Sequence, residues 1–141
     1  MAELPKDMKE HNRRLVEQFR ADGRRMGDSP MLVLTTVGRR TGRPHTTPMM
    51  YVRDGERLLV LASNAGAPDH PDWYLNLVAN PQVTVEVDGE EYRATAVVTA
   101  GEERDRLFAG TVEQYPFFAD HQAGISRTIP VVALAREADG G

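Results

Sequence analysis

The strongest constraint on the fold is a pair of Asp-Gly dipeptides, Asp54-Gly55 and Asp88-Gly89, each placed between two short apolar stretches. Asp-Gly is a strong signal for a tight β-hairpin, because both residues tolerate the positive φ that such turns need. Before the second pair, Val83, Val85 and Val87 alternate with polar residues, as in a strand with one buried face. The chain is therefore expected to build an antiparallel sheet.

The rest of the pattern predicts a mainly β, α+β fold with a single barrel of about six antiparallel strands and flanking helices. The strands are expected at 31–37, 46–52, 57–62, 83–87, 91–98 and 128–135, and helices at 6–26, 72–79 and 102–114, with 115–127 irregular. Pro48 suggests that its strand lies at an edge or carries a bulge. We divide the chain into an amphipathic helix and linker (1–28), the barrel domain (29–136) and a frayed tail (137–141).

Composition excludes several classes of protein. The chain has no cysteine, which rules out disulfide scaffolds, thiolate nucleophiles and Cys-ligated metals. The four histidines lack metal-binding spacing, so no metal is expected. No apolar stretch could span a bilayer and no signal sequence is recognisable, so we predict a soluble, cytoplasmic protein.

Charge is unevenly distributed along the chain. The net charge is −4, but residues 1–57 carry +4 and residues 58–141 carry −8. An acidic chain is a poor nucleic-acid binder, whereas the basic first half suits a small anionic ligand. In the helix predicted at 6–26, Val16 and Phe19 lie on the apolar stripe and Arg13 and Arg20 on the basic face. This helix is expected to dock on the barrel, with peripheral membrane contact or binding of a ligand's tail as the alternatives.

Four segments could carry chemistry. The turn 38–44 holds three arginines and two glycines, which suits phosphate or carboxylate binding, although a solvated turn is equally compatible. The loop 62–66 could present backbone N–H groups to a flat ligand, and the aromatic residues of 72–76 could wall one, although a plain loop and core packing are the commoner outcomes. The segment 115–121 could form an apolar lid, with His121 as a proton donor, or only a small hydrophobic cluster.

Together, and in this order, these segments resemble the deazaflavin (coenzyme F420)-dependent nitroreductase family of split β-barrel (FMN-binding-like) oxidoreductases. The resemblance rests on the stretches 34–42, 51–55, 62–67, 71–81, 120–122 and 127–132. It implies a split barrel that holds the anionic coenzyme in a groove. The cofactor-binding residues that it implies are Arg39, Arg40, Thr41, His45, Thr46, Thr47, Pro48, Met49, Met50, Leu61, Ala62, Ser63, Asn64, Asp72, Trp73, Tyr74, Leu75, Asn76 and Phe118.

The resemblance further implies hydride transfer from reduced F420 to an acceptor. We expect a flat, apolar small molecule, such as a quinone, an activated enone or a nitroaromatic, between Met50, Trp73, Tyr115, Phe117 and Phe118. His121 and Phe118 are the candidate catalytic residues. A nitroreductase of the family carries tyrosines at these two positions, arginine in place of His45 and lysine in place of Asn64, so nitro reduction is not carried over.

Two alternative functions remain open beside F420-dependent hydride transfer. Related split barrels use FMN, so an FMN-dependent oxidoreductase is the alternative enzyme. A non-catalytic carrier of the coenzyme or of a lipophile is the non-enzymatic alternative. The protein is expected as a monomer or a homodimer.

Overall fold

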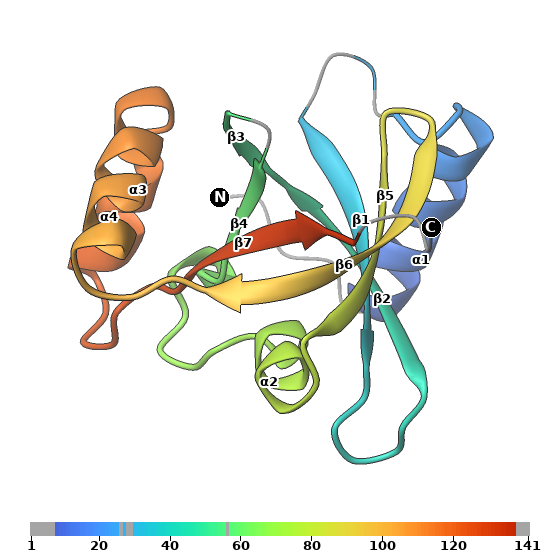
Figure 1. The fold of residues 1–141 in the computed structure, drawn as a ribbon, viewed down its shortest axis with the longest axis horizontal. Helices are drawn as coiled ribbons and strands as arrows, with labels where there is room; N and C mark the ends of the chain where they lie inside the picture. The colour runs from blue at the N-terminus through green and yellow to red at the C-terminus, as the bar shows by residue number, and fades with distance from the viewer. Residues whose placement is uncertain (1–7, 26, 28–29, 56, 138–141) are drawn as a thin grey trace.

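A computed structural model describes residues 8–25, 27, 30–55 and 57–137 of the chain. Its helices are α1 (Met8–Ala21), α2 (Asp72–Ala79), α3 (Gly101–Gln114) and α4 (Phe117–Ala123), with a short 3-10 turn, η1 (Asn64–Gly66). Its strands are β1 (Met31–Val37), β2 (Pro44–Met50), β3 (Val52–Asp54), β4 (Arg57–Leu61), β5 (Gln82–Val87), β6 (Glu90–Val98) and β7 (Val131–Arg136). All strand pairs are antiparallel, in the order β2-β1-β5-β6-β7-β4-β3 (Figure 1).

The two edge strands of this sheet, β2 and β3, are consecutive in the chain and are separated only by Tyr51. One residue cannot bridge two distant edges, because consecutive Cα atoms are about 3.8 Å apart. The sheet must therefore curl until its edges come together. This is the split barrel that the sequence predicts, and Tyr51 is buried at the point where the edges meet.

Both Asp-Gly hairpins are present. Asp54 faces Arg57 across the first turn, and Val87 faces Glu90 across the second, where Asp88 has a φ of 48° and Gly89 a φ of 80°. These positive values are those of a tight hairpin turn. Pro48 lies on the edge strand β2, where a missing N–H leaves no gap in the sheet.

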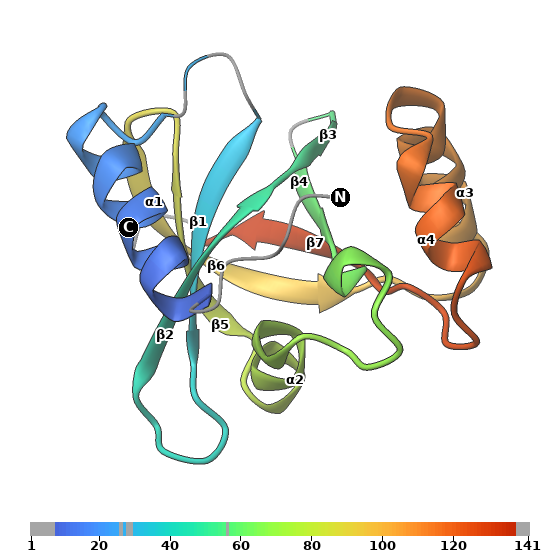
Figure 2. The ribbon, with the colours of Figure 1, turned by 180° about the vertical axis from the view of Figure 1, so that it is seen from behind.

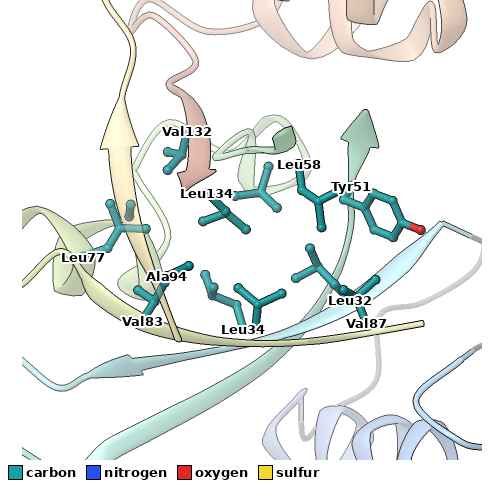
Figure 3. Packing of buried hydrophobic residues seen from close by; sticks show 13 residues of the cluster. Leu32, Leu34, Tyr51, Leu58, Leu77, Val83, Val87, Ala94, Val132 and Leu134 are labelled. Atoms are coloured by element: carbon teal, nitrogen blue, oxygen red, sulfur yellow. The ribbon is translucent and has the colours of Figure 1, made fainter. Parts of the chain in front are cut away.

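The barrel is filled by apolar side chains from six of the strands and from α2. Leu32, Leu34, Leu58, Val85 and Val132 are almost completely buried, and Figure 3 shows side chains of this cluster pointing toward one another between the strands. Leu77 of α2 packs on the same cluster. The burial of α2 against the barrel sets the position of the residues on its other face.

Helix α1 docks on the outside of the barrel. Val16 and Phe19 are buried against Val33, as its apolar stripe predicts. Beside them, Arg20 donates from Nε and Nη2 to the two carboxylate oxygens of Glu86 on β5, both at 2.8 Å. Glu86 is buried, and the hydrogen bonds from Arg20 lower its pKa despite that burial. Apolar contact and a buried ion pair thus hold α1 in place.

The structure corrects three expectations. The strand expected at 46–52 starts at Pro44 and ends at Met50, and Val52–Asp54 forms a separate strand, because the chain changes partner at Tyr51. The sheet therefore has seven strands rather than about six. The segment 115–127, expected to be irregular, contains α4, whose residues have modest helix propensity but bury Phe118.

The helix expected at 6–26 ends at Ala21 within the described residues, and its positions 6, 7 and 26 lie outside them, as do 138–141 of the expected tail. Helix α1 and the α3–α4 pair lie at opposite ends of the molecule, with α2 between them (Figures 1 and 2). No helix in the described part of the chain has the length and apolarity to cross a membrane.

The Arg20–Glu86 pair generates a prediction on stability. Glu86→Gln removes the charge but keeps the shape, and we expect a loss of about 2 kcal/mol in the free energy of unfolding at pH 7. Because the pKa of Glu86 is lowered in the fold, its contribution is present above about pH 4.3 and is lost as the pH falls through the folded-state pKa. The difference between wild type and variant in urea unfolding should therefore shrink below that pH.

Glu90→Gln is the matched control. Glu90 is exposed and pairs with Arg136 at 3.2 Å, so its replacement should cost less than about 1 kcal/mol. Equal losses in the two variants would show that the buried pair does not hold α1.

Candidate active site

Three hollows follow one another along the edge strand β2. The first, of about 160 Å³, lies at the basic turn between β1 and β2. The second is a cleft of about 600 Å³ between α1, β2 and α2, and the third, of about 280 Å³, is lined by the end of β2, the loop after β4 and the start of α4. His45, Asp72 and Asn76 line both the first and the second, and Trp73 lines both the second and the third. The hollows therefore adjoin one another, and together they are called the groove.

At the basic end, Arg39 is held by α2. Its Nη1 and its backbone N–H donate to Asn76 Oδ1 at 2.8 and 3.2 Å, and Nη2 lies 3.3 Å from Asp72 Oδ1. Asn76 is buried and donates in turn to Thr36 Oγ1 at 3.2 Å. Arg39 therefore shapes the turn, whereas Arg40 is exposed beside it.

Gly38 explains how the turn closes on His45. A Cβ atom at position 38 would lie 2.6 Å from His45 Nε2, so the imidazole occupies the space that only glycine leaves free. Together with Arg39, Arg40 and Thr41, His45 surrounds a small hollow rich in polar donors, which the carboxylate of Asp72 also lines. Such a donor set fits a phosphate or carboxylate group.

The central cleft is partly built by α1, whose residues the sequence did not place among the candidate site residues. Asn12, Arg13, Val16, Glu17 and Arg20 line it opposite β2 and α2. The periodicity of the helix showed its two faces but could not show which element its polar face would meet. Arg13 pairs with Glu10 and Glu17, and Arg20 with Glu86, so this face is less basic than the sequence suggests.

The third hollow is apolar. It is lined by Pro48, Met49, Met50, Val52, Leu61, Ser63, Asn64, Ala65, Trp73, Phe117 and Phe118. Phe118 is almost fully buried, and its ring lies 4.4 Å from that of the exposed Phe117, centroid to centroid. In the described part of the chain, the backbone N–H groups of Ser63, Asn64 and Ala65 have no acceptor. An apolar hollow with free amide donors at one side suits a flat ring with a polar edge.

Most of the cofactor-binding residues implied by the family resemblance line this groove. Three residues of that set, and the candidate catalytic residue His121, do not line it. Ala62 is fully buried beneath the loop, Tyr74 packs on the core and on His70, and Leu75 is half-buried outside the three hollows. His121 lies one turn beyond Phe118 on α4, its ring centroid 6.0 Å from that of Phe118. Its buried Nδ1 has no hydrogen-bond partner among the described residues.

The expected acceptor site is also revised at one residue. Tyr115 packs on the cluster around Leu107 and does not line the third hollow itself, whereas Phe117 lines it as expected. Tyr115 follows the end of α3, and the chain turns at Pro116 before α4 begins, so the Tyr115 ring lies 6.1 Å from that of Phe117, centroid to centroid, and only Phe117 reaches the hollow.

Comparisons with known proteins point to one family. The model of the F420H2-dependent quinone reductase family matches residues 7–136. An F420H2-dependent quinone reductase of Mycobacterium tuberculosis is 39% identical over 113 residues, which cover 78% of this chain and 76% of that protein.

Two solved structures agree with this assignment. An F420H2-dependent reductase, FDR-A, is 36% identical and superposes with a TM-score of 0.68, over 74% of this chain and 93% of its own. A protein described as a domain-swapped dimer is 35% identical and superposes with a TM-score of 0.72, over 90% of this chain and 96% of its own. The similarity extends over both the barrel and the groove, and the chain belongs to the F420H2-dependent quinone reductase family, oxidoreductases of the split-barrel fold whose cofactor is coenzyme F420.

Proposed function

We propose that this chain binds F420H2 along the groove beside β2 and reduces a quinone in the apolar hollow at its end. The observation that supports this arrangement is the order of the hollows, from a basic turn through a polar cleft to an apolar hollow. The coenzyme has the same order, because an anionic phosphate and oligoglutamate tail leads to a flat deazaflavin ring. The residues of the groove therefore fit the coenzyme.

Each part of the groove has a proposed role. Arg39, Arg40, Thr41 and His45 bind the anionic part, and Thr46, Thr47, Asp72 and Asn76 line its path. Pro48, Met49, Met50, Leu61, Ser63, Asn64, Trp73 and Phe118 surround the ring. Ala62, Tyr74 and Leu75 support these residues from behind.

When bound, the reduced deazaflavin supplies a hydride, which together with one proton converts a quinone to a quinol. The protein contributes the geometry of this transfer. Met50, Trp73, Phe117 and Phe118 exclude water and stack on a flat acceptor, which holds it against the ring at reacting distance. Apolar walls favour quinones and activated enones over charged acceptors.

We further propose His121 as the source of the proton. Its imidazole lies behind Phe118 and Phe117, with ring centroids 6.0 and 5.5 Å away. An imidazole with an unpartnered ring nitrogen can accept a proton there and donate one from its other nitrogen.

We propose a homodimer as the assembled form, supported by the similar protein that forms a domain-swapped dimer. The cytoplasmic location and the peripheral membrane contact through α1 remain predictions from the sequence.

The first prediction for this site concerns the basic turn. Titration of the protein with F420 and with FMN, followed by the fluorescence of Trp73, should show preferential and salt-sensitive binding of F420. Arg40→Gln should raise the Kd for F420 about tenfold, since one charge-assisted hydrogen bond is worth about 1.5 kcal/mol. Arg43→Gln is the matched control: Arg43 is exposed in the same turn but does not line the hollow, so the Kd should change little. Tighter binding of FMN would overturn the cofactor proposal.

The second prediction concerns the acceptor. Phe118→Leu keeps an apolar side chain in a buried position but removes the flat face, and we expect the KM for a quinone to rise about three- to tenfold in steady-state F420H2 oxidation. Phe108→Leu serves as control, because Phe108 packs on the cluster around Leu107, outside the three hollows. An unchanged KM in the Phe118 variant would remove this residue from the acceptor site.

The third prediction concerns the proton. His121→Phe fills a similar space without a nitrogen that can donate a proton, so kcat should fall about 100-fold. The rate is measured with saturating F420H2 and quinone, and a wild-type kcat in the variant would assign the proton to solvent.

A further inference from the structure

Arg127, in the segment between α4 and β7, binds the loop that follows β4. Its guanidinium donates to four backbone carbonyl oxygens: Ala62 at 3.0 Å, Ser63 at 2.9 Å, Ala67 at 3.0 Å and Pro68 at 3.1 Å. The planar fork of arginine offers five donors in a fixed geometry, which allows one side chain to reach several carbonyls at once. A segment 60 residues earlier in the chain is thereby attached to Arg127.

The surroundings of Arg127 show that binding this loop is its main role. Across the described ranges, no carboxylate forms an ion pair with it, and its fifth contact is to His70 Nδ1 at 3.1 Å. Because an arginine can only donate, His70 must accept at Nδ1. Burial and, next, the charge of Arg127 lower the pKa of His70, which favours that neutral form. The side chain is therefore occupied entirely by the loop.

The loop needs an external restraint. Asn64 and Ala65 have φ values of 50° and 54°, in the left-handed region, which asparagine adopts readily but which costs alanine about 1–2 kcal/mol. Such conformations persist where surrounding contacts impose them. Arg127 supplies these contacts on both sides of Asn64 and Ala65.

The same contacts orient the amide groups of the apolar hollow. In a planar trans peptide the carbonyl oxygen and the following N–H point to opposite sides. Because Arg127 binds the carbonyls of Ala62 and Ser63, the N–H groups of Ser63 and Asn64 point away from it. These are amides that have no acceptor in the described structure, and both residues line the third hollow.

Helix α4, which forms another wall of the third hollow, is hydrogen-bonded to the same segment between α4 and β7. Gln122 of α4 donates from Nε2 to the carbonyl oxygen of Arg127 at 2.7 Å and accepts at Oε1 from the backbone N–H of Ile129 at 2.8 Å. Helix α4 also carries Phe118. The ring-facing amides and the aromatic wall are thus both positioned relative to one short segment.

We propose that Arg127 is a positioning residue for hydride transfer. It holds the N–H groups of Ser63 and Asn64 at the place where they meet the polar edge of the coenzyme ring, at a set distance from Phe118. Arg127 itself does not line the groove. This inference rests on the proposed function, in which the hydride leaves the reduced ring, which is oxidised, and the acceptor is reduced.

The test uses Arg127→Gln and Arg127→Lys in the full chain. A displacement of about 1 Å can cost up to about 100-fold in rate, so the rate constant of single-turnover F420H2 oxidation by a quinone should fall at least about tenfold in Arg127→Gln. The Kd for F420 should change less than about threefold, because the anion contacts lie at the basic turn. In the protein without coenzyme, hydrogen exchange should accelerate at Gly66 and Ala67, whose amides bond to carbonyls of the loop, but not at Gly38 and Gly42 of the basic turn.

Arg106→Gln, an exposed position on α3, is the matched control and should leave all three measurements at wild-type values. If Arg127→Gln does not fold, the same three measurements are made on Arg127→Lys, which keeps the charge but loses the planar fork. In Arg127→Ala, added guanidinium ion should partly restore the rate. An unchanged rate in a folded variant, or a parallel loss of rate and coenzyme affinity, would overturn the inference. Failure of the wild type to bind F420 would instead overturn the proposed function, while hydrogen exchange still tests the hold of Arg127 on the loop.

Discussion

One continuous stretch of chain, Pro44–Met50 followed by Val52–Asp54, occupies both edges of the same sheet, and the rest of the structure depends on that constraint. With only Tyr51 between them, the edges cannot separate, so the sheet closes on a single apolar core. Closure also places the end of β2 beside Leu61 and Val52, which belong to the opposite edge region. The apolar end of the groove exists because the two edges meet there.

Polar contacts give the groove its walls. Asn76 holds Arg39 at the basic turn, Glu86 holds Arg20 and with it α1, and Arg127 holds the loop after β4. Each contact joins segments that are distant in the sequence, and two of them use a buried polar partner. Such groups are costly to bury unless they are hydrogen-bonded, so each pairing is specific to one arrangement of the chain. Apolar packing makes the barrel compact, and these pairings decide where its edges and loops lie.

Much of this could be predicted from local signals. Asp88-Gly89 indicated its hairpin because the turn depends on the φ values of those two residues, and α2 was predicted at its observed bounds between Pro71 and Asn80. Helix α4 was missed because its seven residues have only a modest intrinsic preference for a helix and are held by the burial of Phe118. The contribution of α1 to the cleft and the position of His121 outside it were equally inaccessible, since both depend on how helices pack.

The sequence by itself determined the antiparallel sheet, its hairpins, the basic turn and the order of the family motifs. These are properties of neighbouring residues: turn conformation, alternation of apolar side chains and local charge. The tertiary structure alone decided that β2 and β3 form the two edges, that α1 faces β2 across a cleft, and that Arg127 binds the carbonyls of Ala62 and Ser63. The physical reason is that such contacts form between groups far apart in the chain, and only closure of the barrel around its core brings them within hydrogen-bonding distance.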